Sequence, residues 1–300
     1  MKKIIIACCL LAAFSLNVAE AAKQKAKHVV LVALDGWGAY SVPKADIPNI
    51  KSLMENGCYT LKQRSVLPSS SAINWASMFM GLPTEIHGYT QWDSRKPEIP
   101  ALYQNAHGIS PTIFSIIREK MPKAETGCLY EWDGIKYLID SLAVNHVEGT
   151  PDYDNHQDLL FDHAVSYIKA KRPTFVAICC DQIDHVGHGI GHDTPAYYAQ
   201  LKKVDANIGR IVEALKEAGI YDDTVIIFTA DHGGVNKGHG GKSLREMEIP
   251  FIISGRGVKK GGEIHDITMQ YDTPATIAYI LGVETPDFWR GRPILSAFKK

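Results

Sequence analysis

The sequence predicts an α/β protein built on a mostly parallel central sheet with helices on both faces. Four short apolar runs have the length and composition of buried strands: residues 28–34, 174–180, 224–230 and 249–254. Between the second and third runs, residues 195–218 carry apolar side chains at helical spacing instead. Because helices that alternate with strands usually connect parallel neighbours, this order favours a sheet that is covered on both faces.

Two of the expected helices can be delimited by their end signals. The longer one should span residues 195–218, with Asp193 or Thr194 as its N-cap and a proline in its first turn. A shorter helix should begin near Thr273 and end at Gly282, because glycine readily closes a helix at its C-terminus.

The first residues have the pattern of an export signal. Lysines at positions 2 and 3 precede an apolar run, residues 4–16, and a small-x-small cleavage motif follows at Ala19-Glu20-Ala21. The apolar run is shorter than the roughly 20 residues that a membrane-spanning helix requires. We therefore expect residues 1–21 to be a cleaved signal peptide, and the mature chain to be periplasmic or secreted without a membrane span.

Residues 22–300 are expected to form a single catalytic domain with a small cap segment near residues 89–110. The chain has a net charge of −1 and no block of Lys or Arg, which argues against binding to a nucleic-acid polymer. We expect the partner to be a small molecule that is held in a pocket. Four cysteines of the mature chain are expected to be buried thiols: Cys58, Cys128, Cys179 and Cys180.

Residues that can bind metal ions follow the predicted strands. In open α/β sheets, ligands gather at the carboxyl ends of the strands, so these side chains should lie close together. They supply three carboxylates, three imidazoles and one hydroxyl: Asp35, Asp184, Asp231, His188, His232, His239 and Ser71. This set is large enough for two divalent metal ions with a shared nucleophile.

Spacing alone leaves one part of this set open. Asp184 and His188 lie four residues apart after a strand, where a turn could direct both at one ion, but Asp181 and His185 have the same spacing. Asp231-His232 gives a stronger signal, because the glycines that follow permit the backbone angles of a tight turn.

Ser71 is a candidate nucleophile. It lies in residues 67–81, where a polar turn enters an apolar helix, and it follows two other serines, Ser69 and Ser70. The N-terminus of a helix offers free N–H groups and a favourable dipole to a phosphoryl oxygen. The alternative is that these serines only cap the helix.

These motifs together resemble the alkaline phosphatase superfamily, and within it the type I phosphodiesterase/nucleotide pyrophosphatase branch. The matching segments are Asp35-Gly36, Pro68 to Gly81, Thr84 to Gly88, Asp184 to Gly191, Asp231 to Gly233 and Gly238 to Gly241. The resemblance implies an alkaline phosphatase-like core, and it selects Asp184 with His188 as ligands. It also places Ser71 at the nucleophile position, and Asn74 where the branch carries an asparagine that contacts a phosphoryl oxygen.

The resemblance further implies two metal sites. One ion would be bound by Asp35, Asp231, His232 and the nucleophile Ser71, and the other by Asp184, His188 and His239. Nitrogen and oxygen ligands suit Zn²⁺ best, with Mn²⁺ as the alternative. Ser71 would attack phosphorus to give a phosphoseryl intermediate that water then hydrolyses, while Asn74 stabilises the charge on the phosphoryl oxygens.

A phosphodiesterase or nucleotide pyrophosphatase is the expected activity, and a phosphomonoesterase is the alternative. A monoesterase would profit from added cations, for which the candidates are Arg64, Arg95, Lys237 and Lys242. A sulfatase would need Pro and Arg after the nucleophile, which residues 71–75 lack, and a phosphoethanolamine-type transferase usually adds membrane helices. A binding protein with a dead site would not need the complete ligand set. Candidates for stacking on a substrate are Trp75, Tyr89, Trp92, Tyr130 and Trp132, with Trp92 preferred.

Overall fold

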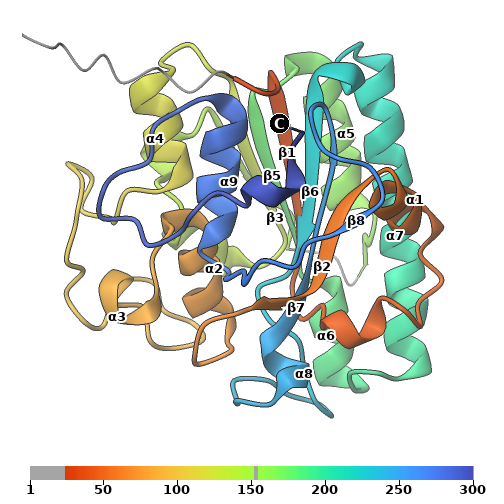
Figure 1. The fold of residues 1–300 in the computed structure, drawn as a ribbon. Helices are drawn as coiled ribbons and strands as arrows, with labels where there is room; N and C mark the ends of the chain where they lie inside the picture. Colours follow the sequence, from red (N-terminus) through yellow and green to blue (C-terminus); the bar gives the residue numbers. More distant parts are fainter. Residues whose placement is uncertain (1–23, 152–154, 300) are drawn as a thin grey trace, which may run out of the picture.

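The computed structural model describes residues 24–151 and 155–299, so the predicted signal peptide lies outside the described residues. One eight-stranded sheet, in the order β4-β3-β5-β1-β6-β7-β2-β8, runs through the molecule (Figure 1). The strands are β1 (His28–Leu34), β2 (Gly57–Arg64), β3 (Thr126–Tyr130), β4 (His146–Gly149), β5 (Phe175–Cys180), β6 (Thr224–Thr229), β7 (Glu248–Gly255) and β8 (Gly262–Glu263). The predicted α/β class with a mostly parallel sheet is confirmed.

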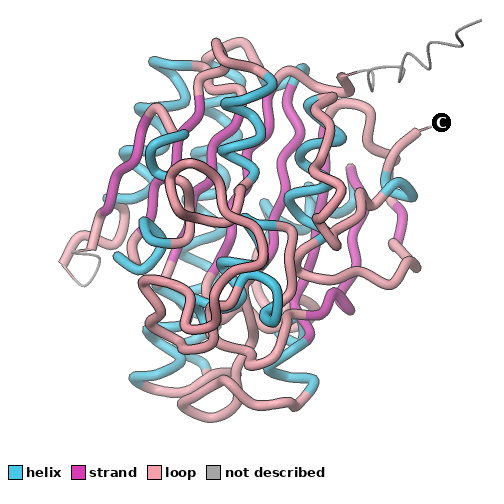
Figure 2. Tube along the Cα trace, turned by 90° about the vertical axis from the view of Figure 1, so that its left-hand side faces the viewer, coloured by secondary structure: helices cyan, strands magenta, loops and turns pink. Residues whose placement is uncertain are grey.

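Helices cover both faces of this sheet. The helices are α1 (Pro48–Glu55), α2 (Ser71–Met80), α3 (Thr84–His87), α4 (Ile113–Lys120), α5 (Leu159–Lys171), α6 (Gln182–Gly189), α7 (Pro195–Glu217), α8 (Leu244–Met247) and α9 (Asp272–Leu281). Helices α2, α4 and α9 pack on one face of the sheet, and α1, α5 and α7 pack on the other (Figure 1). The view turned by 90° shows the strands side by side between these helical layers (Figure 2).

The parallel centre of the sheet consists of β1 between β5 and β6. Leu31 of β1 lies opposite Ala177 of β5 on one side and Ile227 of β6 on the other. Every residue of β1 after His28 is buried, because successive side chains enter the two opposite cores. The three predicted strands therefore end at one edge of the sheet, and the polar residues that follow them are brought together there.

The fourth predicted strand has the opposite direction. Residues 249–254 lie within β7, which pairs antiparallel with both β6 and β2. The chain can reverse here because the connection after β6 is a loop with the short helix α8 rather than a long crossover helix. Strands β2, β3, β4 and β8 lack the continuous apolar runs of the parallel centre. Of these four, only β3 is fully buried, and it is short.

Helix ends follow the expected signals closely. Thr194, rather than Asp193, caps α7, since its side chain accepts a hydrogen bond from the backbone N–H of Tyr197 at 3.3 Å. Gly282 closes α9 in the left-handed conformation, with φ of 70°. All four cysteines of the described residues are free and buried. No helix in residues 24–151 or 155–299 combines the length and apolar character needed to cross a membrane.

A buried histidine ties the end of α3 to α2. The backbone N–H of Tyr89 donates to His87 Nδ1 at 3.1 Å, so Nε2 carries the proton and donates to Ser77 Oγ at 3.1 Å. Burial lowers the pKa of His87 to about 3, because the charged form would lose its hydration. This contact holds the start of the segment that leads into residues 89–110.

Acid should therefore weaken the protein through His87. Below pH 6.5 the unfolded chain binds a proton that native His87 does not accept until about pH 3, so stability is lost as the pH falls. Between pH 7 and pH 5 this loss should reach about 2 kcal/mol. Urea unfolding of the wild type and His87→Gln at both pH values measures it. The wild type should lose more free energy of unfolding than the variant, and equal losses would contradict this assignment.

Candidate active site

The candidate site lies where β1, β5 and β6 end. Asp35 follows β1 directly, Asp231 lies two residues after the end of β6, and Asp184 lies on α6 just after β5. The backbone of Gly36 has φ of 68°, which turns the chain so that its N–H donates to Asp231 Oδ1 at 3.1 Å. A Cβ at Gly36 would lie 2.5 Å from Asp184 Oδ1, so only glycine permits this approach of the three carboxylates.

One group of candidate ligands is fully buried. The ligand atoms of Asp35, Asp231 and His232 all lie within 4.8 Å of one another. His232 Nε2 is 3.4 Å from Asp35 Oδ1 and 3.2 Å from Asp231 Oδ2. Ser71 Oγ lies 3.2 Å from the same nitrogen, so the nucleophile candidate joins this group.

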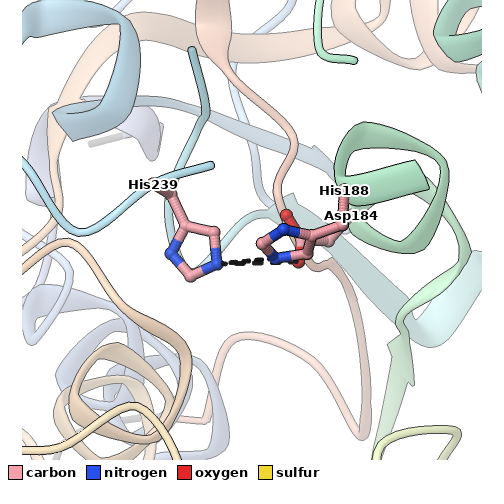
Figure 3. Close-up of side chains that lie close together, drawn as sticks. All are labelled: Asp184, His188 and His239. Atoms are coloured by element: carbon pink, nitrogen blue, oxygen red, sulfur yellow. Dashed lines mark hydrogen bonds and ion pairs between the residues drawn. The ribbon is translucent and has the colours of Figure 1, made fainter. Parts of the chain in front are cut away.

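A second group lies nearer the surface. It comprises Asp184, His188 and His239, whose ligand atoms again lie within 4.8 Å of one another (Figure 3). His188 Nε2 is 3.0 Å from Asp184 Oδ2 and 3.1 Å from His239 Nε2. The expected turn after β5 is in fact helix α6, and one helical turn separates Asp184 from His188.

The structure groups Asp184 with His188, as the resemblance implied, and not Asp181 with His185. Asp181 also approaches Asp35 and Asp184 within the same limit of 4.8 Å, but this group contains no histidine. His185 belongs to none of the ligand groups found among the described residues.

The three histidines of these groups share one orientation. In each ring Nδ1 faces a backbone carbonyl, which accepts its proton: Gly233 O for His232 at 2.9 Å, Lys237 O for His188 at 3.0 Å and Ser69 O for His239 at 3.1 Å. In His232 and His239, Nε2 is therefore left with its lone pair directed into the group. His188 Nε2 donates to Asp184, which raises the pKa of His188 to about 9, so this ring must lose a proton to bind a metal ion. Carbonyl partners of this kind fix the tautomer of histidines that bind metal ions.

Buried carboxylate oxygens also favour a bound cation. Asp35 Oδ1 and Asp231 Oδ2 have no hydrogen-bond partner and no access to solvent. Burial raises the pKa of Asp35, and the neighbouring Asp231 raises it further; burial and then Asp184 raise the pKa of Asp231. A divalent ion would partner these oxygens and remove this repulsion, so the donor set fits a pair of such ions.

Asp184 has a different environment from the other two carboxylates. Although burial opposes its ionisation, hydrogen bonds from His188 and His192 hold the pKa of Asp184 well below its usual range. Burial also lowers the pKa of His232 and of His239, which keeps both rings neutral and able to bind metal.

Ser71 is the first residue of α2, and it is 7% exposed. The N-cap position of this helix is occupied by Ser70, and no side-chain hydrogen bond caps the helix there. Ser69 Oγ donates instead to Gly241 O at 2.7 Å. Of the three serines, Ser71 is thus the one whose hydroxyl contacts a candidate metal ligand.

Asn74 lies beneath this turn. Its Oδ1 accepts from Val66 N at 2.7 Å, and its Nδ2 donates to carbonyl oxygens of Val66, Pro68 and Ser70 at 3.1 to 3.2 Å. The side chain is fully buried and does not line the cavity at the site. These contacts make Asn74 the internal support of the turn that carries the serines, while its predicted contact with a phosphoryl oxygen stays a prediction.

A cavity of about 150 Å³ opens beside the two ligand groups. It is lined by Ser71, Trp92, Trp132, Asp181, Asp184, His185, His188 and His239. Trp92 and Trp132 are therefore the two aromatic candidates that face the site. Trp75 is buried instead, and its Nε1 donates to Asp35 Oδ2 at 3.1 Å, a contact that sequence reasoning missed.

None of the candidate cations lines this cavity. Arg64 pairs with Glu248 at 3.2 Å, and the guanidinium of Arg95 lies over the ring of Tyr137. Lys237 Nζ donates to Gly189 O at 2.8 Å. The described walls of the cavity thus combine ligand groups with two tryptophans and offer no Lys or Arg.

Comparisons with known proteins show the family of this chain. A family model described as type I phosphodiesterase/nucleotide pyrophosphatase matches residues 29–239. Lipoteichoic acid synthase 2 of Bacillus subtilis is 26% identical over 273 residues, which cover 81% of this chain and 38% of the relative. Bis(5'-adenosyl)-triphosphatase enpp4 of Xenopus laevis is 25% identical over 218 residues, which cover 68% of this chain and 46% of the relative.

A third relative has a sulfatase name. The extracellular sulfatase SULF-1 homolog of Drosophila melanogaster is 34% identical over 101 residues, which cover 32% of this chain and 9% of the relative. The chain thus spans less than half the length of these three relatives.

Solved structures share the fold. Human ectonucleotide pyrophosphatase/phosphodiesterase 5 superposes with a TM-score of 0.74 at 14% identity, covering 91% of this chain and all of that one. A 2-O GAG sulfatase superposes with a TM-score of 0.72 at 16% identity, covering 90% of this chain and 73% of that one. Since identity is this low, these likenesses establish the fold alone.

Removing one buried carboxylate should stabilise the metal-free protein. In Asp231→Asn, the amide oxygen can keep the hydrogen bonds from Gly36 and His232, while the new NH₂ group can donate toward His232 Nε2, 3.2 Å from Asp231 Oδ2. We expect a gain of at least about 1 kcal/mol, or roughly 2 to 4 °C in Tm.

Thermal unfolding with EDTA and with Zn²⁺ measures this effect. Zn²⁺ should raise the Tm of the wild type and should raise the Tm of Asp231→Asn by less, because the variant lacks a charged ligand in one of the two groups. Asp222→Asn, at an exposed acidic position, is the matched control and should behave like the wild type. A rise in Tm with Zn²⁺ as large in Asp231→Asn as in the wild type would argue against Asp231 as a ligand.

Proposed function

Because the chain belongs to the type I phosphodiesterase/nucleotide pyrophosphatase family, we propose that it is a two-metal hydrolase of phosphate esters with a preference for diesters. The observation that carries this proposal is the position of Ser71 Oγ, 3.2 Å from His232 Nε2 and at the wall of a cavity shared with the second ligand group. A hydroxyl, two sets of ligands and an open cavity are the parts that such a reaction requires.

The proposed ligand sets are those that the geometry brings together. Asp35, Asp231 and His232 would bind one ion beside Ser71, and Asp184, His188 and His239 would bind the other. Their nitrogen and oxygen donors suit Zn²⁺, with Mn²⁺ as the alternative. When bound, these ions would supply Lewis-acid activation and would neutralise charge on the phosphoryl group.

In the proposed reaction, Ser71 attacks phosphorus and Asn74 supports the turn that carries it. Ser71 Oγ loses its proton and forms a bond to phosphorus as the bond to the leaving group breaks, and the departing oxygen takes up a proton. Water entering through the cavity then attacks the phosphoseryl group, which releases the product and restores the serine. The Asn74 contacts described above hold the turn still, so that the hydroxyl keeps one position through both steps.

The walls of the cavity favour a diester over a monoester. A phosphate monoester carries more negative charge than a diester, and enzymes commonly balance such charge with Lys or Arg. The described walls offer no Lys or Arg, but they include the rings of Trp92 and Trp132. Trp92 is 59% exposed, so its ring is available to pack on an apolar or planar substituent of the substrate.

The sulfatase name of one relative defines the competing activity. Sulfate and phosphate esters share a tetrahedral centre, so a metal site alone does not separate them. Residues 71–75 lack the Pro and Arg that sulfatases carry after the nucleophile, which favours phosphate. We also propose that residues 1–21 are a signal peptide that directs export of the protein and is then cleaved.

Substrate comparison tests the proposed function. Purified enzyme with Zn²⁺ or Mn²⁺ should hydrolyse bis-p-nitrophenyl phosphate faster than p-nitrophenyl phosphate, and p-nitrophenyl sulfate slowest. Ser71→Ala should lower kcat for the diester by more than about 1,000-fold, because the nucleophile is lost. Ser69→Ala is the matched control and should retain activity. If the monoester or the sulfate is hydrolysed faster than the diester, the diesterase proposal is wrong. If Ser71→Ala is active, Ser71 is not the nucleophile.

Trp92 should contribute to substrate binding rather than to chemistry. Trp92→Ala should raise KM for bis-p-nitrophenyl phosphate by about 2- to 10-fold, the usual effect of losing an aromatic contact, with a smaller change in kcat. Leu102→Ala, which alters an exposed apolar side chain of the same segment that does not line the cavity, should leave KM unchanged. An equal change in both variants would indicate a general effect on the segment.

A further inference from the structure

His192 contacts the candidate site without belonging to either ligand group. It lies between α6 and α7, eight residues beyond Asp184, and its side chain is completely buried. Its Nε2 lies 3.2 Å from Asp184 Oδ1. We propose that His192 is a positioning residue that holds Asp184 and the segment leading to His239 in place for the second metal ion, an inference that rests on the proposed function.

The two carboxylate oxygens of Asp184 have different partners. His192 Nε2–H donates to Oδ1, whereas Oδ2 faces His188 Nε2 at 3.0 Å and His239 Nε2 at 3.7 Å. One oxygen is thus held by the protein, and the other is presented to the ion. A carboxylate that is held in this way cannot rotate away from the ligand position.

His192 also contacts the loop on the opposite side of the site. The backbone N–H of His192 donates to Asn236 O at 2.6 Å, and His192 Nδ1 lies 3.2 Å from the same oxygen. Asn236 has φ of 53° and lies in a tight turn closed by two backbone hydrogen bonds between Val235 and Gly238. Because His239 directly follows this turn, His192 joins the helix that carries Asp184 to the loop that carries His239.

Two glycines leave the space that the ring of His192 occupies. A Cβ at Gly187 would lie 2.4 Å from the His192 ring, and a Cβ at Gly234 would lie 2.3 Å from it. The imidazole therefore fits between two glycines, one from each ligand-bearing segment. Any larger residue at either position would displace the ring, so both segments are shaped around this histidine.

Variants of His192 can separate its hydrogen bond from its packing. His192→Phe keeps a ring between the two glycines but removes the donor to Asp184, and His192→Ala removes both. His87→Gln is the matched control, because it alters a buried histidine that contacts neither ligand group. Circular dichroism and Tm of the metal-free proteins show that each variant is folded.

Zinc binding is the readout. Each protein is stripped with EDTA and titrated with Zn²⁺ against a chromophoric chelator, and the bound zinc is counted after dialysis. The wild type and His87→Gln should each bind two ions. His192→Phe should keep one ion at wild-type affinity and bind the second roughly 10- to 100-fold more weakly, the usual effect of losing a partner of a metal ligand. Added Zn²⁺ should then restore most of its diesterase activity.

The outcomes distinguish this inference from the proposed function. A wild type that binds fewer than two ions would overturn the two-metal proposal, and the inference with it. A wild type with two ions and a folded His192→Phe that binds both at unchanged affinity would overturn the inference alone. Weakening of both ions to the same extent would also overturn it, because the contacts of His192 lie with the second group.

Discussion

The structure depends on the convergence of three carboxylates at one edge of the sheet. Asp35, Asp184 and Asp231 come from segments that follow β1, β5 and β6, and all three are buried. At Asp35 and Asp231, lost hydration and repulsion between the carboxylates oppose folding of the metal-free chain. The parallel centre of the sheet overcomes this, because β1, β5 and β6 are held by continuous ladders and buried on both faces.

The histidines connect this edge to the loops around it. His188, His232 and His239 each donate to a backbone carbonyl, and for two of them that carbonyl lies far along the chain, on Lys237 and Ser69. The loops are consequently tied to the site by the same rings that would bind metal. Metal binding and loop order should be coupled, since an ion that holds Nε2 also fixes the carbonyl partner of Nδ1.

Much of this arrangement could be predicted from the sequence, because it follows from local patterns. β1, β5 and β6 are continuous apolar runs, and the residues after them must meet if the strands are parallel. Side-chain direction could not be predicted in the same way. Trp75 was expected to be a possible stacking residue but bonds to Asp35, and His192 carried no motif signal at all. Such contacts depend on how separate segments pack, which spacing along one chain does not record.

Trp92, in the segment of residues 89–110, contacts both helix α2 and the cavity. The carbonyl of Trp92 accepts a hydrogen bond from the backbone N–H of Ala72 at 3.1 Å, so this segment closes the first turn of α2 beside Ser71. The indole of the same residue lines the cavity. One backbone contact therefore fixes the position of the proposed nucleophile relative to the wall of the cavity. A change in this segment would alter both the support of Ser71 and the shape of the cavity, which makes it the natural place for specificity to vary without disturbing the ligand groups.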